Sequence, residues 1–225
     1  MKKLKKIILL FISLLLLSSC FEIIEEITLH KNGSGDIAIT LNLSQSKSKI
    51  ASIMLMDSIN GFQIPSRSEI TNFVKKTTVT IKNTSGISNV KSSLDLDNFI
   101  LNFSCNFENI HALNQVIAAF GNHKERSKIN KQQHFIYNTN TQHFSRSYHY
   151  DLSKEFDKVK AIDKNALKEA SYTTIYRFDQ PIISTSNRLS KLAPNKKAVL
   201  IKVSGAAMLT GEHSIKNNIQ LLKEK

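Results

Sequence analysis

Apolar and polar residues alternate along several short segments, in the pattern of strands that are buried on one face. The clearest alternation runs from Phe99 to Phe107, where every second residue is apolar or cysteine. Residues 21–30 and 37–43 alternate in the same way, and Asn32-Gly33-Ser34-Gly35 between them is a turn signal because Asn and Gly tolerate positive φ. The pattern therefore predicts an early β-hairpin and a later strand at 99–107.

Weaker alternation predicts further strands at residues 87–96, 172–178 and 199–203, and a second hairpin within 132–150. One face of the second strand of that hairpin carries Phe144, Arg146 and Tyr148. Ile215, Ile219 and Leu221 have the spacing of a last strand that closes the sheet.

Other segments place apolar residues at the three- and four-residue spacing of helices. Residues 44–58 and 110–120 have this pattern, and Ser66 with Glu69 forms a capping box before a third helix at about 70–81. Residues 151–170 are polar and helix-forming. Strands and helices in this order predict an α+β fold, with a mainly antiparallel β-sheet packed against three or four helices in a single domain at residues 20–225.

The first twenty residues have a different pattern. Four lysines within MKKLKK precede the apolar run Ile7–Leu17, which only Ser13 interrupts. A membrane-spanning helix needs about 20 apolar residues, so this shorter run has the length of a signal-peptide core. The following Leu17-Ser18-Ser19-Cys20 matches the lipobox of bacterial lipoproteins, in which an aliphatic and two small residues precede the cysteine.

This motif predicts that residues 1–19 are a cleaved lipoprotein signal peptide and that Cys20 becomes the lipidated N-terminus. The alternatives are an uncleaved anchor helix and an ordinary signal peptide with a chance cysteine. Because each buried CH₂ group contributes about 0.8 kcal/mol, two or three acyl chains would hold the protein firmly in a membrane. Phe21, in place of an aspartate, favours the outer membrane and its periplasmic face, and Glu22 and Glu25 with their neighbour Glu26 leave surface exposure open.

Charge and cysteine content narrow the function classes. The formal net charge of +13 over 225 residues falls to +9 once the four signal-peptide lysines are removed. These basic residues are spread along the chain without a dense run, and an envelope location argues against nucleic acid as a partner. Lipidation of Cys20 would leave Cys105 without a disulfide partner, and its place between Phe103 and Phe107 predicts a buried core residue.

The late part of the chain carries the motif Tyr176-Arg177-Phe178-Asp179-Gln180-Pro181-Ile182, then Ser186-Asn187 and the strand around Val199–Val203. Together with a Gly-rich hairpin directly after a lipobox, this arrangement resembles the LppM-like family of envelope lipoproteins, mostly of unknown function. The resemblance implies the family's fold over about residues 21–222 and no catalytic residues. Family members often have a tryptophan in the late strand, and this sequence has no Trp.

Motifs of catalysis and metal binding are absent from the sequence or have unsuitable spacing. The sequence has no nucleophile elbow, phosphate loop or paired-cysteine motif. His143 and His149 share one strand face, but at about 3.3 Å per residue six residues span roughly 20 Å, too far for one ion. We therefore expect no catalytic residues, no metal and no cofactor. Asp57-Ser58-Ile59 fits a short pattern that some bacteria O-glycosylate.

The favoured function is that of a non-enzymatic envelope lipoprotein that binds a lipid or another apolar ligand. Its predicted cavity lies between the helix that carries Ile50, Ile53 and Met54 and the strand that carries Leu101 and Phe103. The alternative is a structural or assembly partner of another envelope protein. Membrane contact through the N-terminal lipid is common to both hypotheses.

Replacing the lipobox cysteine tests the signal. Because only its thiol can accept the diacylglyceryl group, Cys20→Ala should leave an unlipidated precursor, visible as a mass shift and as loss of acyl label. The wild-type protein should begin at Cys20 in N-terminal mass spectrometry. A mature N-terminus at any other residue would contradict the prediction.

Overall fold

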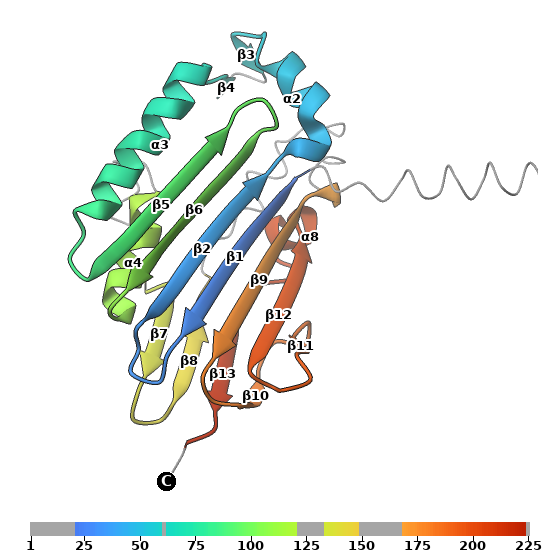
Figure 1. Cartoon of the computed structure of the whole chain (residues 1–225). Coiled ribbons are helices and arrows are strands. Elements are labelled where there is room, and N and C mark those ends of the chain that lie inside the picture. The colour runs from blue at the N-terminus through green and yellow to red at the C-terminus, as the bar shows by residue number, and fades with distance from the viewer. Residues whose placement is uncertain (1–20, 60–61, 121–132, 149–167, 224–225) are drawn as a thin grey trace, which may run out of the picture.

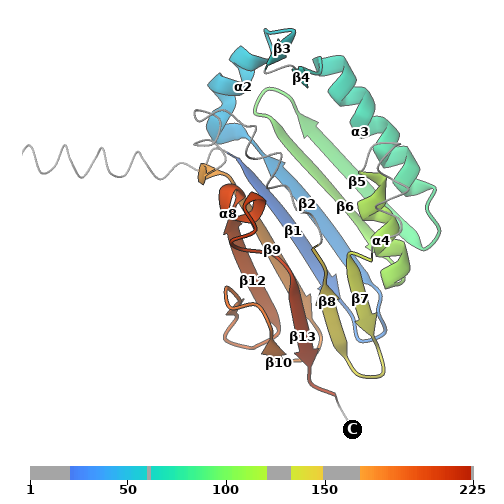
Figure 2. The same ribbon diagram turned by 180° about the vertical axis from the view of Figure 1, so that it is seen from behind.

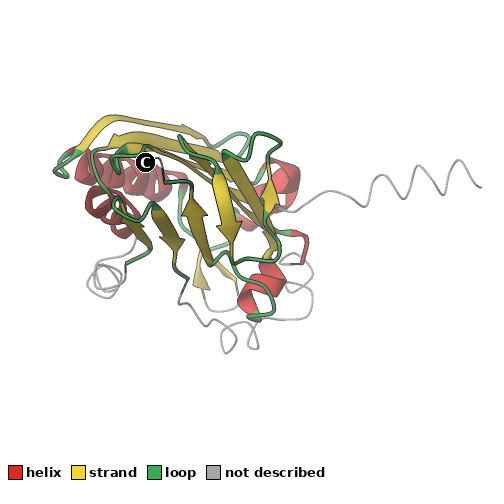
Figure 3. Cartoon of the chain, turned by 90° about the horizontal axis from the view of Figure 1, so that it is seen from below, coloured by secondary structure: helices red, strands yellow, loops and turns green. Residues whose placement is uncertain are grey.

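The computed structural model describes residues 21–59, 62–120, 133–148 and 168–223. In this part of the chain a long twisted sheet lies against a smaller one, and helices flank both (Figure 1). Seen along its end, the large sheet arches over the helices and the second sheet (Figure 3). The predicted α+β class is thus confirmed.

The large sheet has seven strands in the order β11-β12-β9-β1-β2-β6-β5. Neighbouring strands are antiparallel except β1 and β9, which run parallel. Glu22 at the start of β1 therefore lies beside Asn42 at the end of β2 and beside Ser171 at the start of β9. The strands are β1 (Glu22–Leu29), β2 (Gly35–Asn42), β5 (Ile87–Asp95), β6 (Ile100–Phe107), β9 (Ser171–Phe178), β11 (Lys191–Leu192) and β12 (Ala198–Ser204).

The predicted hairpin and the strand at 99–107 are confirmed as β1–β2 and β6. Gly33 has a φ of 88°, which explains the glycine in the turn. Gly35 is required for a different reason, because a Cβ atom there would overlap the carbonyl oxygen of Thr28 and crowd the Phe107 ring.

The second sheet has the order β10-β13-β8-β7, with β7 (Phe135–Asn138), β8 (His143–Arg146), β10 (Ile182–Thr185) and β13 (Asn217–Leu221). The predicted hairpin within 132–150 is confirmed as β7–β8. The prediction that Ile215, Ile219 and Leu221 close the large sheet is wrong, because β13 pairs with β8 and β10. Alternation alone identifies a strand and its buried face, but it does not select the neighbour.

Five helical elements and a small hairpin complete the described part. The 3₁₀ turn η1 (Ser44–Ser46) leads into α2 (Lys47–Ile53), so the helix predicted at 44–58 ends early and the small hairpin β3 (Ser58–Ile59) and β4 (Phe62–Gln63) follows. Helix α3 (Arg67–Lys82) starts at the predicted capping box of Ser66 and Glu69. Helix α4 (Ile110–Ala119) is as predicted, whereas α8 (Gly205–Leu209), β10 and β11 were not. Most of the helix predicted at 151–170 lies outside the described residues.

The main core lies between the inner face of the large sheet and the layer formed by α4 and the second sheet (Figure 2). On one side Phe103 of β6 meets Phe120 edge-on, with ring centroids 5.2 Å apart. On the other side Phe144 of β8 packs against Tyr176 and Phe178 of β9 at 5.3 and 5.5 Å. Cys105 is buried in this core, as predicted.

The close approach at Gly35 gives a stability test. Gly35→Ala should lower the free energy of unfolding by close to 3 kcal/mol, the upper part of the usual range for overpacking, because backbone must move. Gly211→Ala is the matched control. Gly211 has a φ of 74° and no atom within 4 Å of an added Cβ, so only the backbone conformation costs energy, about 1 kcal/mol. Chemical denaturation measures both, and equal losses would contradict the packing at Gly35.

Candidate functional site

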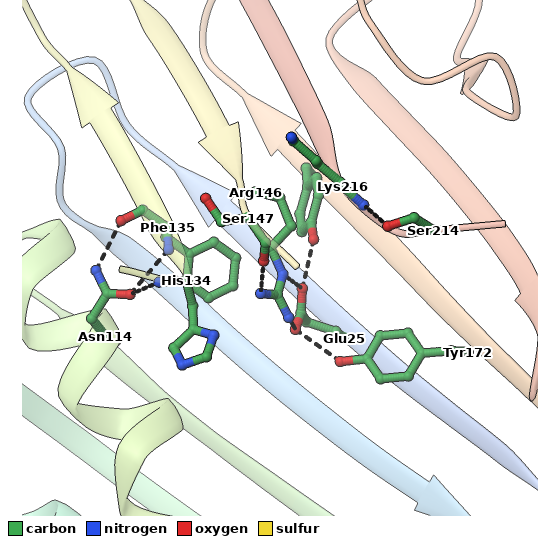
Figure 4. Close-up of polar contacts among 10 residues, drawn as sticks. Glu25, Asn114, His134, Phe135, Arg146, Ser147, Tyr172, Ser214 and Lys216 are labelled. Atoms are coloured by element: carbon green, nitrogen blue, oxygen red, sulfur yellow. Dashed lines mark hydrogen bonds and ion pairs between the residues drawn. The ribbon is translucent and has the colours of Figure 1, made fainter. Parts of the chain in front are cut away.

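A buried carboxylate lies on the inner face of β1. Glu25 occupies an inward position on the same strand face as Ile27 and Leu29, and its side chain is buried between the two sheets. Burying a carboxylate at such a position costs folding free energy unless the group is paired with a cation and hydrogen-bonded. Figure 4 shows the groups that surround it.

Arg146 at the end of β8 supplies the opposite charge. Its Nε donates to Oε1 of Glu25 at 3.1 Å and its Nη2 donates to Oε2 at 2.8 Å, in the parallel two-bond geometry that guanidinium and carboxylate groups favour. The third nitrogen, Nη1, donates to the carbonyl of Ser147 at 2.9 Å. The guanidinium carbon also lies 4.5 Å from the centroid of the Phe135 ring, in a cation–π contact.

Two tyrosines of β9 complete the coordination of the carboxylate. The Tyr176 hydroxyl donates to Oε1 at 2.6 Å and the Tyr172 hydroxyl donates to Oε2 at 2.9 Å. Burial, with the nearby negative charge of Glu25, raises the pKa of both phenols. Both hydroxyls therefore remain protonated donors at physiological pH.

The electrostatics of Arg146 follow from the same contacts. Burial by itself lowers the pKa of a guanidinium, but the adjacent Glu25 carboxylate outweighs it and the pKa of Arg146 is raised. The cation is therefore permanent. Each oxygen of Glu25 accepts two hydrogen bonds, one from Arg146 and one from a tyrosine, which is a saturated arrangement. Such an arrangement holds β8 against β1 and β9 and leaves the carboxylate without free lone-pair capacity for chemistry.

Asn114 of α4 orients the neighbouring strand in a similar way. Its Oδ1 accepts from the backbone N–H groups of His134 and Phe135 at 2.9 and 3.0 Å, and its Nδ2 donates to the Phe135 carbonyl at 2.9 Å (Figure 4). One side-chain amide thus fixes the start of β7. Phe135 is thereby positioned beneath Arg146.

The outer face of the large sheet is hollowed and polar. A depression of about 550 Å³ lies over β1, β2, β5, β6 and β9, and Glu26 and Arg177 form an ion pair of 2.8 Å within it. Asp36 accepts a hydrogen bond from Asn106 on the neighbouring strand. An adjoining depression of about 320 Å³ shares Ala38, Lys91 and Ser104 with the first and extends to Thr40, Ser92, Ser93, Asn102 and Phe103.

The predicted site residues are distributed differently. Ile50, Ile53 and Met54 are half-buried on α2 and at its C-cap, at one end of the large sheet. Leu101 is half-buried near the start of β6, whereas Phe103 is fully buried against Phe120. Neither outer-face depression includes a residue of α2. The apolar cavity between these residues stays a prediction, and Cys20 lies outside the described residues.

The other candidate groups have ordinary surroundings. Burial raises the pKa of the Cys105 thiol to about 12, so it remains protonated and a poor nucleophile. Among the described residues no group of three or more His, Cys, Asp or Glu side chains could hold a metal ion. His149 lies outside the described part, and Ser58 of the glycosylation pattern is exposed.

Comparison with known proteins gives one similar solved structure. No family model matches the chain, and no curated protein matches it. The solved structure is the NMR structure of the folded domain of LppM from Mycobacterium tuberculosis, with 13% sequence identity, a TM-score of 0.43 and coverage of 92% of each chain. Membership of the LppM-like family stays a prediction. In the described residues no helix is long and apolar enough to cross a membrane.

Sequence reasoning missed the Glu25 cluster, although its signal is present in the sequence. Glu25 interrupts the apolar face of the first predicted strand, and Arg146 interrupts that of a later one between Phe144 and Tyr148. Two opposite charges at inward positions of different strands indicate a buried ion pair. The pairing itself depends on how the sheets pack.

Removing the guanidinium should reveal its contribution to stability. Arg146→Met leaves the Glu25 carboxylate buried without a cation, so we expect a loss of about 3–5 kcal/mol in the free energy of unfolding. In the double variant Arg146→Met with Glu25→Leu, the loss of stability should be clearly smaller than the sum of the two single losses, because no unpaired charge stays buried.

The matched control is Arg67→Met, which breaks the exposed ion pair of 3.1 Å with Asp97. Exposed pairs contribute about 0–1 kcal/mol, so this variant should unfold almost as the wild type does. Equal losses for Arg146→Met and Arg67→Met, measured by urea denaturation, would show that the buried pair does not hold the sheets together.

Proposed function

We propose that the protein is a lipid-anchored lipoprotein of the cell envelope that acts by binding and not by catalysis. The observation that carries the anchor is the lipobox Leu17-Ser18-Ser19-Cys20 behind a basic, apolar segment of signal length. The proposed location is the outer membrane, with the domain on the periplasmic face. Its attachment is through acyl chains on Cys20.

Binding is supported by the saturation of the buried charges. The Glu25 and Arg146 side chains satisfy each other, and the Cys105 thiol is buried and protonated. Side chains that act as acids, bases or nucleophiles must be accessible to a substrate and have a pKa suited to their task. These three residues instead serve the packing of the fold.

For the binding surface we favour the polar outer face of the large sheet, defined by the two depressions over β1, β2, β5, β6 and β9. Carboxylate, guanidinium, ammonium and amide groups line these depressions. In Figure 1 no helix of the described residues lies over this face of the strands. Mixed charges of this kind suit the polar surface of another envelope protein. The function is then that of an assembly partner held at the membrane.

A lipid or another apolar ligand is the second candidate. It is favoured by the half-burial of Ile50, Ile53, Met54 and Leu101, which lie outside both packed core clusters. A ligand that covers half-buried aliphatic side chains is stabilised by about 25 cal/mol for each Å² of apolar surface removed from water.

Site-specific photocrosslinking in intact cells distinguishes the two. A photoreactive amino acid at Ser104, which lines both depressions, should capture one defined envelope protein, because the partner covers this face. The same amino acid at exposed Glu212, which lines neither depression, is the control and should capture none. Native mass spectrometry of the purified protein detects any lipid that remains bound.

The outcomes separate the candidates. A Ser104 product that the Glu212 variant lacks supports the assembly partner. Lipid that co-purifies without any crosslink at Ser104 contradicts the outer-face proposal and supports the apolar ligand. A wild-type protein that carries no acyl group on Cys20 would contradict the lipid anchor itself.

A further inference from the structure

One end of the large sheet brings together the segment that follows the proposed anchor and Leu55, the most exposed large apolar residue of the described part. At this end, which we call the entry end, Glu22 begins β1 beside Asn42 of β2 and Ser171 of β9. The Phe21 carbonyl accepts a hydrogen bond of 2.9 Å from the Ser171 N–H group, so the chain is already part of the sheet here.

The short segment from η1 to β4 projects from the same end. It leaves the sheet after Asn42, the direct partner of Glu22, and both views place α2 and β3 beyond this end of the strands (Figures 1 and 2). At the turn after α2, Leu55 is 89% exposed and Met56 is 51% exposed. Among the large apolar side chains of the described residues Leu55 is the most exposed.

This turn has a defined backbone. The N–H groups of Leu55 and Met56 donate to the carbonyls of Ser52 and Ile53 at 3.3 and 2.9 Å, and the Asp57 carbonyl accepts from Ile64 at 3.0 Å on the far side of the β3–β4 hairpin. The two apolar side chains are therefore displayed by a hydrogen-bonded turn. Exposed apolar side chains in such a turn lose little conformational entropy when they enter an apolar phase.

The charges of the segment complement an anionic surface. Residues 43–64 contain Lys47, Lys49 and Asp57 as their charged residues. Lys47 donates to Asn98 at 3.1 Å and thereby ties α2 to the β5–β6 turn, and Lys49 is exposed. Basic residues near an anionic leaflet add to hydrophobic contact when both face the same surface.

From these observations we propose that the tip Leu55–Met56 is a second membrane contact, inserted into the same lipid leaflet that holds the acyl chains on Cys20. The proposal rests on the proposed lipidation of Cys20. That residue is one peptide bond from Phe21, with Cα atoms about 3.8 Å apart, so the entry end must lie at the headgroups. The occupant of the tip is the bilayer itself. Its insertion sets the tilt of the domain relative to the membrane and thereby fixes the orientation of the outer face of the large sheet.

A single tryptophan reports the insertion, because the chain contains no Trp. The full-length lipidated Leu55→Trp protein is reconstituted into vesicles of phosphatidylcholine and phosphatidylglycerol whose acyl chains carry bromine. Its emission should shift to shorter wavelength and be quenched relative to unbrominated vesicles. The matched control is Ile183→Trp on β10, because Ile183 is 61% exposed and lies away from the entry end, and it should show neither change.

The two proposals fail in different ways. Lipidated protein that floats with the vesicles while Leu55→Trp emits as in water, without quenching, overturns the tip and leaves the anchor intact. Protein that carries no acyl group and does not float overturns both. Equal quenching of Leu55→Trp and Ile183→Trp also overturns the tip, since it indicates general adsorption.

Discussion

The ion pair of Glu25 and Arg146 is the interaction on which the arrangement of the two sheets depends. Both groups are buried, and removing either one would leave the other charge unpaired at a cost of about 3–5 kcal/mol, a large part of the stability of a typical domain. Because their hydrogen bonds reach from β8 to β1, with Tyr172 and Tyr176 of β9 attached, the polar cluster specifies one relative position of the sheets. Apolar packing around Phe144 and Phe135 then stabilises that position.

The polar cluster and the apolar core together determine which surfaces of the molecule stay open. The core and the saturated cluster cover the inner face of the large sheet, so the proposed partner or ligand would bind at surfaces that the fold leaves open. The outer face offers polar depressions, and the entry end offers the exposed apolar side chains of Leu55 and Met56. A protein held by lipid near Phe21 would present the first to the aqueous compartment and the second to the membrane.

The identity of buried faces could be read from the sequence with good accuracy. The alternation from Phe99 to Phe107 placed Cys105 in the core, and the Asn-Gly turn located the hairpin of β1 and β2. The sequence pattern did not predict β10 and β11, because these strands are too short to show a periodicity. The helix expected at 44–58 ended at Ile53 because the following residues form a turn and hairpin that apolar spacing does not distinguish from a helix.

The sequence by itself determined the local structure, because turn residues and capping residues act through near neighbours in the chain. The lipobox predicts the envelope location from an equally local pattern. The tertiary structure alone decided that β13 joins a second sheet, that Glu25 meets Arg146 across 121 positions, and that Leu55 lies at the end where the chain enters. These outcomes depend on contacts between distant segments. Their free energies arise only when the sheets pack, so no local pattern records them.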